Sequence, residues 1–62
     1  MTPAEHYDNL AIACIKKASE LEALADLAEK SNDRGTLREL AAKERKEAIS
    51  YLETAKTLAA HA

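Results

Sequence analysis

The chain has 62 residues, with one glycine, one proline, no tryptophan and no phenylalanine. This length allows one domain and the composition favours helix over strand, so a two-domain protein and a sheet protein are both excluded. Eleven acidic and nine basic residues give a net charge of −2, which excludes a strong general attraction to nucleic acid or to an anionic membrane.

Two start signals and one polar stretch divide the chain. Residues 2–5, Thr-Pro-Ala-Glu, combine a capping hydroxyl, a proline at the first helical position and a capping carboxylate, which predicts a helix over about residues 3–30. Turn-forming residues and the single glycine concentrate at 31–35, which predicts the turn. A second box, Thr-Leu-Arg-Glu at 36–39, predicts a helix over about 36–60.

Alanine recurs at every seventh position in each predicted helix: Ala4, Ala11, Ala18 and Ala25, then Ala41, Ala48, Ala55 and Ala62. A seven-residue apolar repeat keeps one helix face turned towards a partner, and alanine lets the backbones approach closely. We therefore expect an all-α chain folded as a single antiparallel two-helix hairpin. Its predicted seam contains Tyr7, Ala11, Cys14, Ala18, Leu21, Ala25, Ala41, Ala48, Tyr51, Ala55 and Leu58.

A turn at 31–35 also predicts which residues face each other. Leu21 is expected opposite Ala48, Ala18 opposite Tyr51, Cys14 opposite Ala55, Ala11 opposite Leu58, and Glu44 opposite Ala25. In the apolar layers a larger side chain then meets a small one, as close packing favours. Other apolar residues lie off this seam, namely Ile12, Ile15, Leu27, Ile49 and Leu52. A hairpin of this size buries little surface alone, so we expect a homodimeric four-helix bundle.

The acidic residue Glu44 interrupts the apolar seam. Glu47 follows it at the i, i+3 spacing, and this stretch resembles the Glu-x-x-His helix of ferritin-like di-metal bundles, with Glu47 in the place of the histidine. Glu44 and Glu47 are therefore candidate metal ligands, and so are His6 and His61, which an antiparallel fold brings towards one end. The interpretation that we favour is structural: Glu44 pairs with Lys43 or with a basic residue of another helix, or it sets the helix register.

No residue set indicates an enzyme. Cys14 faces alanines in the predicted seam with no neighbouring base or cation, so we expect a core thiol rather than a nucleophile. The chain has no glycine-rich phosphate loop and no nucleophile triad, so we expect no cofactor. One cysteine cannot form an internal disulfide, and the N-terminus has neither a basic leader nor an apolar signal core. We therefore expect a cytoplasmic protein that has no membrane partner.

Basic residues are the candidate nucleic-acid contacts: Lys16, Arg38, Arg45 and Lys46. A dimer could merge them into one stripe that follows a phosphate backbone. Acidic residues are interleaved with them, which favours a solvated face of ion pairs.

In its length, two-helix pattern, short polar turn and layered apolar seam, the chain resembles the Rop family of plasmid copy-number modulators. The resemblance implies an antiparallel four-helix homodimer that binds paired RNA loops along one helical face. That face carries a phenylalanine in the family, and this chain has none, so no RNA-binding residue is carried over.

The function that we expect first is a non-enzymatic, homo-oligomeric interaction module, a small regulator or adaptor that binds another macromolecule. The alternatives are a Rop-like RNA binder, a metal or small-ligand bundle using Glu44 and Glu47, and a designed or purely structural bundle.

Overall fold

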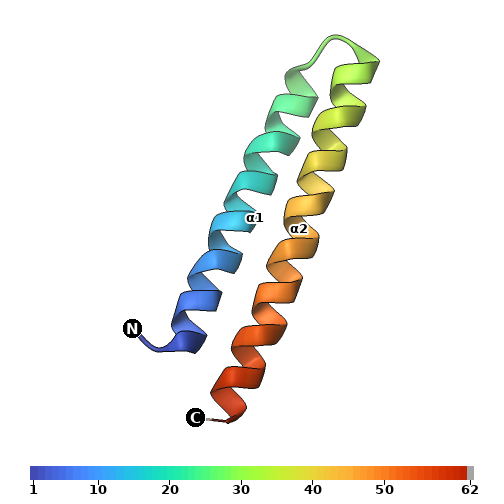
Figure 1. Cartoon of the computed structure of the whole chain (residues 1–62). Coiled ribbons are helices and arrows are strands. Elements are labelled where there is room, and N and C mark those ends of the chain that lie inside the picture. The colour runs from blue at the N-terminus through green and yellow to red at the C-terminus, as the bar shows by residue number, and fades with distance from the viewer. Residues whose placement is uncertain (62) are drawn as a thin grey trace.

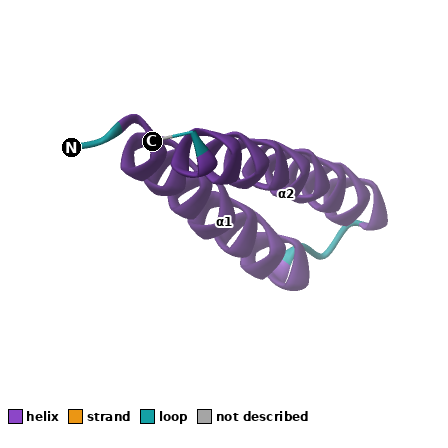
Figure 2. Ribbon diagram, turned by 90° about the horizontal axis from the view of Figure 1, so that it is seen from below, coloured by secondary structure: helices purple, strands orange, loops and turns teal. Residues whose placement is uncertain are grey.

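The computed structural model describes residues 1–61 and contains two helices, α1 (Pro3–Leu27) and α2 (Ser31–Ala60), folded back on each other as a hairpin (Figure 1). The Cα atoms extend over 48 × 16 × 9 Å, so the molecule is one layer of two helices. Figure 2, seen from below, shows the helices side by side with nothing covering either side of the layer. The prediction of an all-helical hairpin is confirmed.

The first helix begins where the sequence predicts. The Glu5 backbone N–H donates to Thr2 Oγ1 at 3.2 Å, and Pro3 occupies the first helical position, where its missing N–H costs nothing. Ala28 ends the helix in an extended conformation, with its N–H bonded to the Ala25 carbonyl at 3.2 Å. The helix therefore stops at Leu27, three residues before the predicted end at 30.

The turn lies at residues 28–30, and the predicted turn at 31–35 is the first part of α2 instead. Ser, Asn and Asp suit the first turn of a helix as well as a loop, and Asp33 there is favourable to the helix dipole. Thr36 caps nothing, because its hydroxyl donates to the Asn32 carbonyl at 3.1 Å within the helix. Among residues 1–61 no glycine has a positive φ, so Gly35 serves as an ordinary helical residue.

The structure buries the alanines of the predicted seam, except that Ala4 is only half-buried. The buried residues among 1–61 are six alanines, each at most 4% exposed: Ala11, Ala18, Ala25, Ala41, Ala48 and Ala55. The remaining predicted seam residues are half-buried: Tyr7, Cys14, Leu21, Tyr51 and Leu58. Ala62 lies outside the described residues.

The predicted pairing across the seam is wrong, because the turn comes earlier and every residue of α1 faces an earlier part of α2. Tyr51 packs against Tyr7, with ring centroids 6.0 Å apart, and not against Ala18. Glu44 meets Lys17 at 3.4 Å and not Ala25. Cys14 faces Glu44 and Glu47 rather than Ala55. This register places Ala18 level with Ala41 and Ala11 level with Ala48, away from Leu58. Leu21 likewise lies level with the residues before Ala41 rather than with Ala48, so the predicted alternation of large and small residues across the seam is absent.

Candidate functional site

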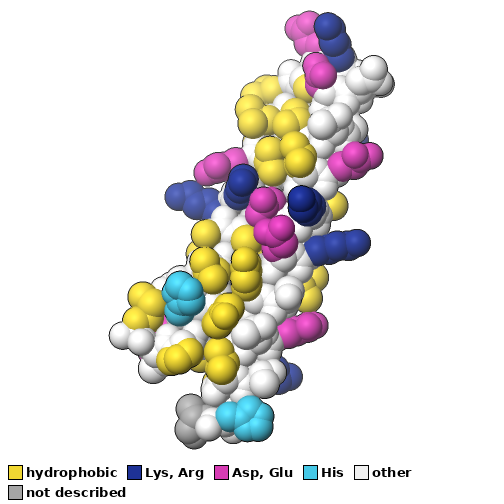
Figure 3. Space-filling view, in the orientation of Figure 1, with side chains coloured by type: hydrophobic (Ala, Val, Ile, Leu, Met, Phe, Trp, Pro, Cys, Tyr) yellow, Lys and Arg dark blue, Asp and Glu magenta, His cyan; other side chains and the backbone are white. Residues whose placement is uncertain are grey.

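One side of the hairpin carries most of the leucines and both tyrosines. These residues occupy heptad positions d and g, which lie on the same side of the seam in the two helices of an antiparallel pair. We call this side the leucine face; it consists of Tyr7, Leu10, Leu21, Leu24, Leu37, Leu40, Tyr51 and Leu58. Figure 3 looks onto it and shows apolar side chains over both helices, above and below a band of charged side chains at mid-length.

The middle of the leucine face is a polar cluster that both helices build, consisting of Cys14, Lys17, Glu44 and Glu47. The ligand atoms of Cys14, Glu44 and Glu47 all lie within 4.8 Å of one another. Lys17 Nζ lies 3.4 Å from Glu44 Oε1, which confirms the expectation that Glu44 reaches a basic residue of another helix. The Glu44 side chain is only 18% exposed, whereas that of Lys17 is 65% exposed. The cluster carries one positive and two negative charges.

The environment of Cys14 suppresses its reactivity. Burial first, then a hydrogen bond to Glu44 and the negative charges of Glu44 and Glu47, raise the pKa of the Cys14 thiol, while Lys17 opposes this weakly. The thiol therefore stays protonated near neutral pH and is a poor nucleophile. The expectation that no base or cation lies near Cys14 is wrong, although the conclusion it supported, an unreactive thiol, agrees with this raised pKa.

The candidate metal ligands fall into two groups. Glu44 and Glu47 are brought together, and the structure adds Cys14 to them, giving the set that could hold a cation among residues 1–61. His6 packs edge-on against Tyr7, with ring centroids 5.5 Å apart. His61 lies ten residues beyond Tyr51, or about 15 Å along the helix, so the shifted register separates the two histidines that were predicted to share one end.

The opposite side of the hairpin carries a smaller apolar patch. We call it the isoleucine face; it consists of Ile12, Ile15, Ile49 and Leu52, each at least 40% exposed. Beyond it towards the turn lie two cross-helix ion pairs. Arg45 binds Glu22 through both carboxylate oxygens, with Nε at 3.2 Å from Oε2, and Arg38 lies 3.8 Å from Asp26.

The basic residues do not form one stripe in the hairpin. Arg38 and Arg45 are engaged by acidic residues of α1 beside the isoleucine face. Lys16 and Lys46 occupy heptad position f on different helices, so they point away from the seam on opposite edges of the layer. The interleaving of opposite charges that the sequence indicates is thus present in space.

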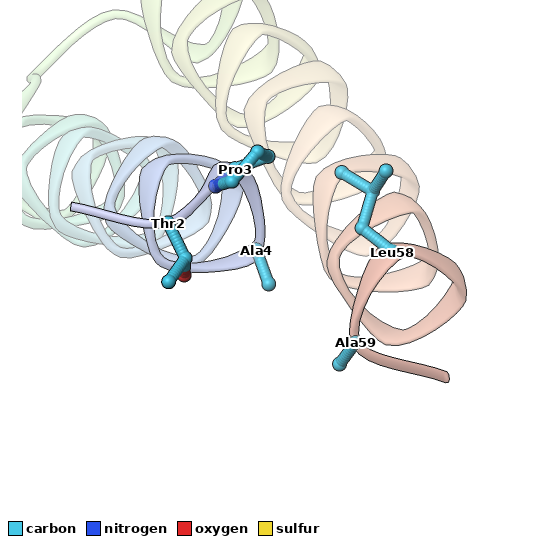
Figure 4. A pocket seen from close by; sticks show the side chains of 5 residues that line it. All are labelled: Thr2, Pro3, Ala4, Leu58 and Ala59. Carbon is cyan, nitrogen blue, oxygen red and sulfur yellow. The ribbon is translucent and has the colours of Figure 1, made fainter. Parts of the chain in front are cut away.

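Two hollows lie at the ends of the hairpin. The first, shown in Figure 4, lies between the first turn of α1 and the last turn of α2, and is lined by Thr2, Pro3, Ala4, Leu58 and Ala59. The second lies near the turn and is lined by Leu24, Ala28, Asp33, Thr36 and Leu37. Both include residues of the leucine face, so that face has an apolar hollow at each end and the polar cluster in the middle.

The fold and surfaces define a small two-helix hairpin with a closed alanine seam and two open apolar faces. Neither helix has a stretch apolar enough to cross a membrane within the described residues. Comparison of the chain with family models, with curated proteins and with solved structures finds no match.

Sequence reasoning missed the polar cluster as a unit. Cys14 and Lys17 are three residues apart, and so are Glu44 and Glu47, so each pair lies on one helix face. The two pairs meet only when the turn is placed at 28–30, because the turn decides which levels of the two helices coincide.

Proposed function

We propose that the protein is a non-enzymatic interaction module that forms a homodimeric four-helix bundle through its leucine face and presents its isoleucine faces to another macromolecule. The observation that carries the proposal is the imbalance between core and surface. Among residues 1–61 the core consists of six alanines, with no large side chain fully buried, while eight large apolar residues are exposed. A hairpin that leaves its large apolar side chains in water gains little from folding alone.

The size of the leucine face fits a dimer interface. A rectangle of 48 by 16 Å, the long and middle extents of the hairpin, has an area of about 770 Å². A stable interface of standard size buries about 800 Å² on each partner. Large side chains cover most of this face, whereas the apolar part of the isoleucine face is confined to four residues. The leucine face is therefore the one that we assign to self-association.

The matched variants Leu24→Lys and Leu27→Lys test this assignment by sedimentation velocity. Both positions lie near the end of α1, but Leu24 is 54% exposed at heptad position g of the leucine face, whereas Leu27 is 79% exposed at heptad position c, outside the residues of that face. We expect Leu24→Lys to shift the protein towards monomer and Leu27→Lys to leave the dimer unchanged. Equal behaviour of the two variants would contradict the assignment.

The same assay separates a protein-binding module from a Rop-like RNA binder. A complex with added RNA that disappears at high salt would favour the RNA binder, because phosphate contacts weaken steeply with salt. If the dimers do not bind RNA, the isoleucine face remains as the surface for a protein partner.

A photo-crosslinking residue at Ile49, with Glu53 as the control position, then reports whether a partner covers that face in cells. Crosslinks at neither position would favour a purely structural bundle. We place the module in the cytoplasm, because its single cysteine is a free thiol.

A metal-binding bundle is the second candidate, and the convergence of Cys14, Glu44 and Glu47 is the observation that favours it. It ranks below the interaction module because Lys17 already supplies a cation beside Glu44. A melting curve with and without Cd²⁺, repeated on Glu44→Ala/Glu47→Ala, distinguishes the two. Stabilisation by Cd²⁺ that the double variant loses would favour metal binding.

A further inference from the structure

We infer that the second copy docks on the leucine face with both turns at the same end of the bundle, so that α1 of each copy lies over α2 of the other. This inference rests on the proposed dimer and adds the orientation of the partner. It follows from the position of the polar cluster and from the uneven division of its charges between the two helices.

A two-fold axis can bring two leucine faces together in two ways. When the axis runs along the hairpin, the turns lie at the same end and α1 lies over the partner's α2. When the axis runs across the hairpin, the turns lie at opposite ends. In that arrangement α1 lies over the partner's α1, and α2 lies over the partner's α2. The polar cluster lies near mid-length, with leucines on both sides of it, so in both arrangements the two clusters meet in one layer.

The charges of this layer distinguish the two arrangements. In the cluster, the positive charge belongs to α1, through Lys17, and the negative charges belong to α2, through Glu44 and Glu47. The opposite-end arrangement places α2 over α2, so four carboxylates from two copies face one another while the lysines face each other. The same-end arrangement places Lys17 of each copy over Glu44 and Glu47 of the other. Like charges that lose water on association are unfavourable, so charge complementarity selects the same-end arrangement.

The capacity of the Lys17 ammonium to bind a further carboxylate supports this arrangement. Lys17 keeps 65% of its side chain exposed while touching Glu44 of its own chain. Its ammonium has three donors, so it can bind a second carboxylate without leaving the first. In the same-end dimer that carboxylate is Glu47 of the partner copy, so each lysine bridges one carboxylate from each copy. A polar layer of this kind fixes the register of helices, because sliding would place Glu44 against leucine.

Double electron–electron resonance on spin-labelled dimers tests the orientation. The label is placed at the turn as Glu29→Cys in a Cys14→Ala background. The same-end arrangement brings the two turns within about 20 Å, since packed helices lie about 10 Å apart. The opposite-end arrangement separates them by about the 48 Å length of the hairpin. A short distance supports the inference, and a long one overturns it while leaving the dimer intact.

A control label at Lys16→Cys, in the same background, lies near mid-length and faces outwards, so both arrangements give it a measurable distance. Absence of coupling at both label sites would overturn the dimer itself, so failure of the proposed function is distinguishable from failure of the orientation.

Charge reversal tests whether the clusters meet. We expect Lys17→Glu alone and Glu44→Lys/Glu47→Lys alone to weaken self-association at least tenfold, and an equimolar mixture of the two variants to form heterodimers. A mixture that remains monomeric, or single variants that dimerise like the original chain, would overturn the inference.

Discussion

Overpacking the alanine seam is expected to destabilise the hairpin, and Ala18→Leu is the sharpest case. Ala18 is completely buried in α1, between Ala11 and Ala25, which are also completely buried. Leucine adds three carbons at a point that lies level with Ala41, which is also buried. Burying those carbons would stabilise by about 2 kcal/mol, at about 0.8 kcal/mol for each CH₂, but only if there were space for them. There is none, so the helices must separate.

Separating the two helices loses contacts along the whole seam, because the six buried alanines are distributed along both helices. Overpacking of this kind costs about 1–3 kcal/mol. For a domain of this size each kcal/mol lowers Tm by about 4–8 °C, so we expect a decrease of roughly 5–20 °C. Circular dichroism at 222 nm, followed on heating at one fixed protein concentration, measures it.

Ala23→Leu is the matched control. Ala23 lies on the same helix but is exposed, so the same substitution there should change stability by no more than about 0.5 kcal/mol. If the two variants melted at the same temperature, the seam would not be closely packed at Ala18 and the reasoning would fail.

Three further outcomes are expected. Gly35→Ala should raise stability by about 0.5–1 kcal/mol in thermal melts, because Gly35 is helical with open space around its Cα; a decrease would mean that it belongs to a turn. Glu44→Gln should speed alkylation of Cys14 by iodoacetamide at about pH 8, because it removes a negative charge that raises the pKa of the thiol; an unchanged rate would contradict this. The hydrogen bond and charge of Arg45 lower the pKa of Glu22, so this pair stabilises the fold above the unfolded pKa and stops doing so as pH falls through the lower folded value. Acid melts should therefore show the small advantage over Glu22→Gln decline once pH falls below the usual glutamate pKa of about 4.3, and an advantage that grew there would contradict the sign.

The fold was largely predictable because its signals are local and periodic. The seven-residue alanine repeat specifies two helices and the face that each buries, and Thr2 with Pro3 specifies the first helix start. The second start was not predictable in the same way. A polar run such as residues 31–35 suits a turn and a first helical turn equally well, and the close packing of the seam decides between them.

The candidate site was less predictable because it depends on the register between helices. Glu44 is visible in the sequence as a charge in an apolar seam, but its partners lie about thirty residues away on the other helix. A displacement of the turn by a few residues replaces Ala25 by Lys17 as the residue that Glu44 meets. Pairing between residues so far apart in the chain has no local sequence signal. The apolar or polar character of each helix face does have one, because it repeats along the helix.

The central claim is that the hairpin folds as a dimer through its leucine face. Sedimentation equilibrium of the unmodified chain over a wide dilution series, with helicity recorded on the same samples, tests it most directly. We expect a mass of twice 6.8 kDa that falls on dilution together with helicity, because the hairpin depends on its partner. A mass of 6.8 kDa with full helicity at every concentration would contradict it.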